Sequence, residues 1–92
     1  MLPVRAEVLI IGRVQGVWFR QSTKIAADRH GVTGWCRNNP DGTVTAVLEG
    51  EESAVQAVVA WCKDGPDLAR VDDIQIDWSA ATGEFAEFSI RR

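Results

Sequence analysis

The sequence has few of the side chains that enzymes commonly use to transfer protons or to bind metals. Its 92 residues include one histidine, His30, two cysteines and no tyrosine. The cysteines, Cys36 and Cys62, do not have the spacing of metal ligands. One histidine and two cysteines cannot complete a zinc site of the usual type. The sequence therefore predicts no metal site.

Long apolar runs and an excess of basic residues are also missing. No segment approaches the ~20 consecutive apolar residues that a membrane-spanning helix needs. The first five residues lack the apolar core of a signal peptide, so we expect a cytoplasmic protein with reduced thiols and no membrane partner. The formal net charge is −3, which leaves no general basic field to attract a nucleic acid.

What is present suits one small globular domain. Apolar residues make up 46% of the chain and charged residues 25%, an ordinary balance for a globular protein. This length is enough for a single two-layer core and too short for two domains. Repeats, low-complexity tracts and linkers are absent from the sequence, so we expect residues 1–92 to form a single domain.

Apolar periodicity and turn residues predict five strands and two helices. Gly31 is a typical helix stop, and Asn39-Pro40-Asp41-Gly42 has the residues of a tight turn in suitable places. In chain order, we expect a strand over 4–11, a helix over 19–30, strands over 32–38 and 43–49, a helix over 51–63, a strand over 71–78 and a short strand over 86–90.

This order, β-α-β-β-α-β with a short extra C-terminal strand, predicts an α+β fold of the ferredoxin-like type. The expected arrangement is an antiparallel sheet with both helices on one face. The place of the fifth strand in the sheet is left open. Since this fold supports nucleic-acid binding, metal transport, ligand sensing and catalysis, it does not by itself indicate a function.

The stretch from Ile11 to Arg20, I-G-R-V-Q-G-V-W-F-R, joins the first strand to the first helix. Its glycines, Gly12 and Gly16, allow backbone N–H groups to converge, and the helix start adds unpaired donors. Arg20 supplies a charged planar fork that suits two phosphate oxygens. An anion site is one interpretation, and a simple change of chain direction is the other. The spacing matches neither a Walker A loop nor a dinucleotide fingerprint.

A second stretch, G-W-C-R-N-N-P-D-G-T-V from Gly34 to Val44, makes the sequence more specific. Together with Ile10 to Arg20, it strongly resembles the acylphosphatase family. The resemblance extends through Gly50 and through Gly65 to Ile74, and so covers essentially the whole chain. It implies the hydrolysis of acyl phosphates to a carboxylate and inorganic phosphate, without a metal or cofactor.

The same resemblance assigns residues. Arg20 corresponds to the family's phosphate-binding arginine, and Asn38 to the asparagine that positions the attacking water. The backbone of the loop corresponds to the phosphate-binding segment, made of Gln15, Gly16, Val17, Trp18, Phe19 and Arg20. The expected partners are a small acyl phosphate and inorganic phosphate, and we expect a free-standing monomer.

Two other classes of function have the same order of elements. An RNA-recognition module would need aromatic residues on the exposed face of the third strand, and residues 43–49 contain none. An anion-binding regulatory module would use Arg20 but would give no reason for Asn38.

Several residues have a second interpretation. Trp18 could stack on the acyl group of a substrate or cover the core, and both interpretations stay open. His30 and Cys62 are expected to be structural, and Trp35, Trp61 and Trp78 are expected to be packing residues. Arg13 and Arg37 are expected to be solvated surface residues and not anion ligands.

Overall fold

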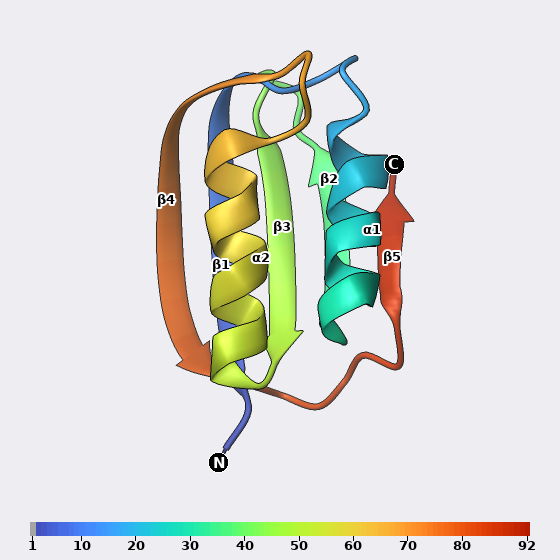
Figure 1. Ribbon diagram of the computed structural model, residues 1–92, viewed down its shortest axis with the longest axis vertical. Helices are drawn as coiled ribbons and strands as arrows, with labels where there is room; N and C mark the ends of the chain where they lie inside the picture. Colours follow the sequence, from blue (N-terminus) through green and yellow to red (C-terminus); the bar gives the residue numbers. More distant parts are fainter. Residues whose placement is uncertain (1) are drawn as a thin grey trace.

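Two helices cover one face of a five-stranded sheet in the computed structural model, which describes residues 2–92 (Figure 1). The elements follow the predicted order. They are β1 (Val4–Arg13), α1 (Phe19–His30), β2 (Thr33–Asn38), β3 (Val44–Gly50), α2 (Glu52–Asp64), β4 (Arg70–Ala80) and β5 (Phe88–Arg91).

The bounds of α1 agree with the prediction, because Gly31 adopts a left-handed conformation and ends the helix. The bounds of β2, β3 and α2 shift by a residue. Two strands are longer than predicted, since β1 continues to Arg13 and β4 extends at both ends to Arg70 and Ala80. At one end the two extensions pair with each other, Arg13 with Arg70, and at the other end the added residue Ala80 pairs with Val4. Pairing between distant strands therefore sets these ends.

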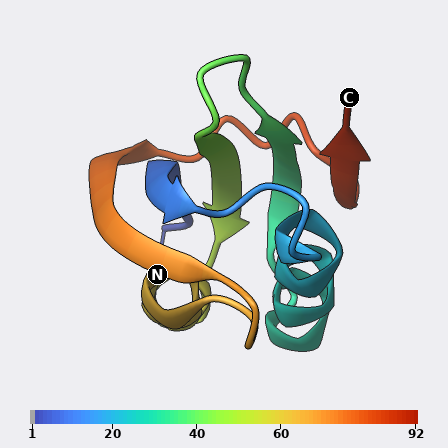
Figure 2. The ribbon, with the colours of Figure 1, turned by 90° about the horizontal axis from the view of Figure 1, so that it is seen from above.

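The strand order in the sheet is β4-β1-β3-β2-β5. The first four strands pair antiparallel, as predicted, and both helices lie on the same face (Figures 1 and 2). The short strand β5 pairs with β2 in parallel, so the complete sheet is mixed. The chain reaches β5 through residues 81–87, which cross below the sheet from β4 to the opposite edge in Figure 1.

The core lies between the helices and the sheet. Its largest fully buried side chains include Phe19 from α1, Phe88 from β5 and Ile10 from β1. Cys36 and Cys62 are fully buried in the same cluster and are free thiols. The prediction that Cys62 is a core residue is therefore confirmed.

A buried carboxylate fixes the crossing segment 81–87 to the sheet. Glu49, at the end of β3, is 3% exposed. It accepts hydrogen bonds from the Arg5 guanidinium at 3.0 Å, from the Thr82 N–H and hydroxyl at 3.0 and 2.9 Å, and from the Gly83 N–H at 3.1 Å. Burial by itself raises the pKa of Glu49, but the bonds from Thr82, Gly83 and Arg5 outweigh it and hold the pKa below its usual value.

Across residues 2–92, neither helix combines the length and the apolar character that crossing a membrane requires.

Candidate active site

The loop between β1 and α1 alternates between buried and outward-facing residues. Val14, Val17 and Phe19 are buried in the core, whereas Gly16 and Trp18 face outward. The apolar side chains anchor the loop from below and leave its outer side, with its backbone, available to a ligand.

Two glycines shape this loop. At Gly12 the pairing of β1 with β4 shifts register, and a Cβ there would lie 2.1 Å from the Arg70 carbonyl oxygen. Any side chain at this position would therefore collide with β4. Gly16 has a φ of 72°, which favours glycine, and allows the chain to turn toward α1.

The start of α1 presents unpaired backbone donors. The first helical bond is donated by the Ser22 N–H to the Trp18 carbonyl at 3.0 Å. Within the described part of the chain, the N–H groups of residues 15 to 21 donate to no protein acceptor. Such a run of free N–H groups at a helix N-terminus, with the positive end of the helix dipole, is a typical anion site.

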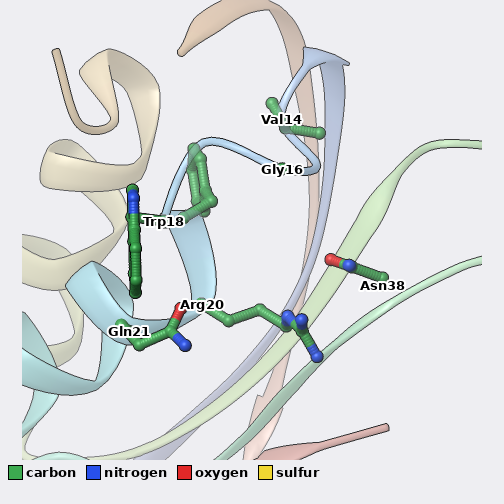
Figure 3. A pocket seen from close by; sticks show the side chains of 7 residues that line it. Val14, Gly16, Trp18, Arg20, Gln21 and Asn38 are labelled. Atoms are coloured by element: carbon green, nitrogen blue, oxygen red, sulfur yellow. The ribbon is translucent and has the colours of Figure 1, made fainter. Parts of the chain in front are cut away.

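Arg20 lies in the first turn of α1, and its guanidinium extends toward Asn38 (Figure 3). Its Nη1 donates to the Arg91 carbonyl in β5 at 3.3 Å. This bond orients the guanidinium and uses one of its five donors, so the others stay available. Beneath it, the Cys36 thiol donates to the Arg20 carbonyl oxygen at 3.8 Å.

Asn38 is the last residue of β2, and side-chain hydrogen bonds hold the tight turn that follows. The Asn39 amide nitrogen donates to the hydroxyls of Thr43 and Thr45 at 3.0 and 2.7 Å. The Gln15 side chain joins this turn to the loop, because its Nε2 donates to the carbonyls of Asn39 at 2.7 Å and Thr43 at 2.9 Å.

An open pocket of about 270 Å³ lies between the loop, α1 and β2 (Figure 3). It brings together five of the seven predicted residues: Gly16, Trp18, Phe19, Arg20 and Asn38. The other two do not line it, since Val17 is buried and the Gln15 side chain turns toward the β2–β3 turn. Val14 and Gln21 line the pocket and were not predicted; their places next to the motif residues were the available signal.

Among the lining side chains that the structure describes, Arg20 is the one with a charge. Burial raises the pKa of Cys36 to about 12, with a small opposing effect of Arg20, so the thiol below the pocket stays protonated. His30 lies at the far end of α1 and does not line this pocket. Within residues 2–92 there is no cluster of three or more His, Cys, Asp or Glu that could hold a metal.

The surface arginines and the tryptophans differ in their contacts. Arg13 and Arg37 are exposed and do not line the pocket, in agreement with the prediction. Trp61 packs on Phe19 with ring centroids 5.5 Å apart, and the Trp35 ring contacts the guanidinium of Arg37 at 5.5 Å. Trp18 is 67% exposed and Trp78, which was expected to pack, is 47% exposed. Trp18 therefore does not cover the core.

Comparisons with known proteins agree along the whole chain. The model of the family described as Acylphosphatase matches residues 6–90. An acylphosphatase of Methylococcus capsulatus is 51% identical over 88 residues, which are 96% of each chain. An acylphosphatase of Pyrobaculum islandicum is 54% identical over 88 residues, covering 95% of this chain and 93% of that one.

Solved structures give the same result. The crystal structure of an acylphosphatase from Bacillus subtilis superposes with a TM-score of 0.93 at 35% identity, covering 97% of this chain and 99% of that chain. Full-length HypF, in its phosphate- and nucleotide-bound form, superposes with a TM-score of 0.86 at 30% identity, but the match covers 12% of that longer chain. The family match, the identities and the fold together show that this chain belongs to the acylphosphatase family.

Proposed function

We propose that this protein hydrolyses acyl phosphates to a carboxylate and inorganic phosphate. Arg20 and the backbone of residues 15–20 hold the phosphate, and Asn38 positions the attacking water. One observation carries the proposal: a guanidinium at the start of α1 and an amide at the end of β2 line the same pocket, beside a run of unpaired N–H groups.

Phosphoryl transfer passes through a loose transition state in which charge is spread over three equatorial oxygens. Catalysis then consists mainly of holding the groups in place and stabilising this charge. Donors that are fixed before the reaction do this best. The loop is fixed by buried Val14 and Val17, and the guanidinium by its bond to the Arg91 carbonyl.

The leaving group explains why no acid is needed. A carboxylate has a conjugate acid with a pKa of about 4, judging from side-chain carboxyls, so it can leave without a proton. A water that attacks a metaphosphate-like phosphorus needs orientation more than deprotonation. The Asn38 carbonyl oxygen can provide it by accepting a hydrogen bond from that water. A phosphate monoester is a poorer substrate for this site, because its alkoxide would need protonation.

An anion-binding module without turnover is the rival from another class. It would use the same loop and Arg20, but it would have no use for an amide opposite the guanidinium. The presence of Asn38 in the pocket therefore supports hydrolysis.

The test is phosphate release from acetyl phosphate in the presence of a chelator, for the parent protein and three variants. Arg20→Lys should lower the rate about 10³-fold or more, by comparison with other arginines that stabilise phosphoryl transfer. It should also weaken inhibition by inorganic phosphate. Arg13→Lys is the matched control, since Arg13 is exposed on the same stretch outside the pocket, and it should behave like the parent.

Asn38→Ala distinguishes positioning of the attacking water from binding of the phosphate. If Asn38 holds water, the rate should fall about 10²-fold or more while inhibition by phosphate is retained. Near-parent turnover in a folded Arg20→Lys protein would refute the assignment of Arg20. Loss of phosphate affinity in Asn38→Ala as large as in Arg20→Lys would instead place Asn38 among the phosphate ligands.

A further inference from the structure

Trp18 occupies a backbone conformation that does not suit it. With φ 66° and ψ 23°, it is the only non-glycine residue with a positive φ among residues 2–92. Glycine adopts this conformation without steric cost, whereas a tryptophan Cβ crowds the neighbouring carbonyl. The residue also stands at the N-cap of α1 and makes no side-chain cap hydrogen bond. Helix capping therefore does not explain why a tryptophan is here.

Packing does not explain it either. The Trp18 side chain is 67% exposed, although it is the largest apolar side chain of the loop. The buried positions on either side, Val17 and Phe19, already anchor the loop to the core. An unfavourable backbone conformation combined with an exposed aromatic ring at a pocket is a pattern often found at functional sites.

The place of Trp18 in the pocket suggests what the ring contacts. In Figure 3, the Arg20 guanidinium extends toward Asn38, whereas the Trp18 indole lies near the other end of the Arg20 side chain, away from Asn38. Trp18 lines the same pocket as both residues. Phosphoryl transfer requires the attacking and leaving oxygens to be roughly in line through the phosphorus. If Asn38 holds the water, the acyl group leaves on the side of the phosphate that faces away from Asn38. Trp18 is the exposed aromatic residue of the pocket, and its ring lies away from Asn38.

We propose that Trp18 is a specificity-determining residue that stacks on the acyl group and favours acyl phosphates with an aromatic acyl group. This inference rests on the proposed function, because it uses the in-line geometry that Asn38 and Arg20 define. The reaction is unchanged: water attacks phosphorus, the bond from phosphorus to the acyl oxygen breaks, and the carboxylate leaves with the electron pair. An aromatic carboxylate presents a flat face that the indole can cover in an offset-stacked arrangement.

The experiment compares kcat/KM for benzoyl phosphate and for acetyl phosphate. These substrates share the phosphate and the leaving carboxylate and differ in the group that would meet Trp18. In Trp18→Ala, the ratio of benzoyl to acetyl kcat/KM should fall about fivefold to tenfold, the size expected for loss of one aromatic contact. Trp18→Phe keeps a ring and should retain most of the ratio.

Two further variants separate the ring from other effects. Trp18→Gly removes the ring and also relieves the backbone, so it should lower the ratio as Trp18→Ala does. Trp78→Ala removes an exposed tryptophan of β4 that is outside the pocket, and it should leave both substrates unaffected.

The outcomes are distinct. If the parent releases phosphate from neither substrate, the proposed function fails. If the parent hydrolyses both and Trp18→Ala keeps the parent ratio, the inference about Trp18 is overturned. An equal loss on both substrates in all three Trp18 variants would also overturn it, because the residue would then shape the loop without contacting the acyl group.

Discussion

The Gln15 side chain offers a test of how the two halves of the site are held together. Its Nε2 donates to the carbonyls of Asn39 and Thr43, in the turn directly after Asn38. Gln15 itself belongs to the loop that leads to Arg20. Replacing it with methionine keeps the length and removes both hydrogen bonds, so Gln15→Met loosens this link without changing any group that lines the pocket.

The hydrogen bonds that remain at the two carbonyls determine how much stability Gln15→Met should lose. Losing a hydrogen bond costs ~1 kcal/mol net and up to ~3 when a buried partner is left unpaired. Here each carbonyl keeps a backbone partner, because the Gly42 N–H donates to Asn39 at 3.1 Å and the Asn39 N–H donates to Thr43 at 2.8 Å. The lower value therefore applies, and the free energy of unfolding should fall by about 1–2 kcal/mol. A domain of ordinary stability stays folded after such a loss.

Within the site, the loss of this link should affect catalysis more than phosphate binding. The phosphate is held on the loop side of the link, whereas the transition state also needs the water on the Asn38 side. We therefore expect kcat to fall about tenfold, since ~1.4 kcal/mol of lost positioning corresponds to that factor. The inhibition constant of inorganic phosphate should change much less.

The assay is phosphate release from acetyl phosphate, together with phosphate inhibition and urea unfolding. The matched control is Gln75→Met, an exposed glutamine of β4 without a side-chain hydrogen bond among the described residues. A folded Gln15→Met protein with the kcat of the control would show that the link does not position Asn38. A fall in phosphate affinity as large as the fall in kcat would show that Gln15 supports the loop alone.

Two further predictions concern protonation. Glu49→Gln should lower the free energy of unfolding by about 3 kcal/mol, because it breaks a buried charged pair, whereas Glu7→Gln, at a carboxylate with a 54% exposed side chain, should have little effect. Since the folded-state pKa of Glu49 is depressed, its contribution is complete above the unfolded value of 4.5 and is lost as pH falls through the lower folded-state value. Urea unfolding between pH 7 and pH 3 should thus show a smaller loss of stability in Glu49→Gln than in the parent, and equal slopes would contradict the prediction. Turnover should be flat from mildly acidic to mildly alkaline pH, since a guanidinium and amides do not titrate there; a sharp bell near neutrality would show that a titrating side chain takes part and would contradict the assignment.

The sequence predicts those features whose signals are local. Gly31 ends α1 where the helical pattern stops, and the residues of the β2–β3 turn have turn chemistry at each position. The alternation of apolar and other residues from Val14 to Phe19 explains why the loop is anchored and why its outer side is open. These features depend on neighbouring residues, so a single sequence contains them.

Features that depend on distant partners are not accessible in this way. The Gln15 side chain donates hydrogen bonds to residues 24 and 28 positions away, whereas the sequence indicates only the loop to which Gln15 belongs. In the sequence, Glu49 resembles a solvent-facing charge at a strand end. In the fold it is buried and accepts hydrogen bonds from donors that lie 33 and 34 positions later in the chain. The four residues of β5 alternate like any short strand, and their parallel pairing with β2 depends on where the crossing segment delivers them.

The meeting of Arg20 and Asn38 belongs to a third kind of feature, which follows from element lengths. α1 has 12 residues and β2 has 6. At ~1.5 Å per helical residue and ~3.3 Å per strand residue, the helix spans about 18 Å and the strand about 20 Å. The chain runs down α1, reverses at Gly31 and returns along β2 (Figure 1). Because the two spans match, Arg20 in the first turn of the helix and Asn38 at the end of the strand arrive at the same end of the fold. An insertion of one turn into α1 would displace Arg20 from Asn38 by about 5 Å, so the site depends on this match as much as on the identity of its residues.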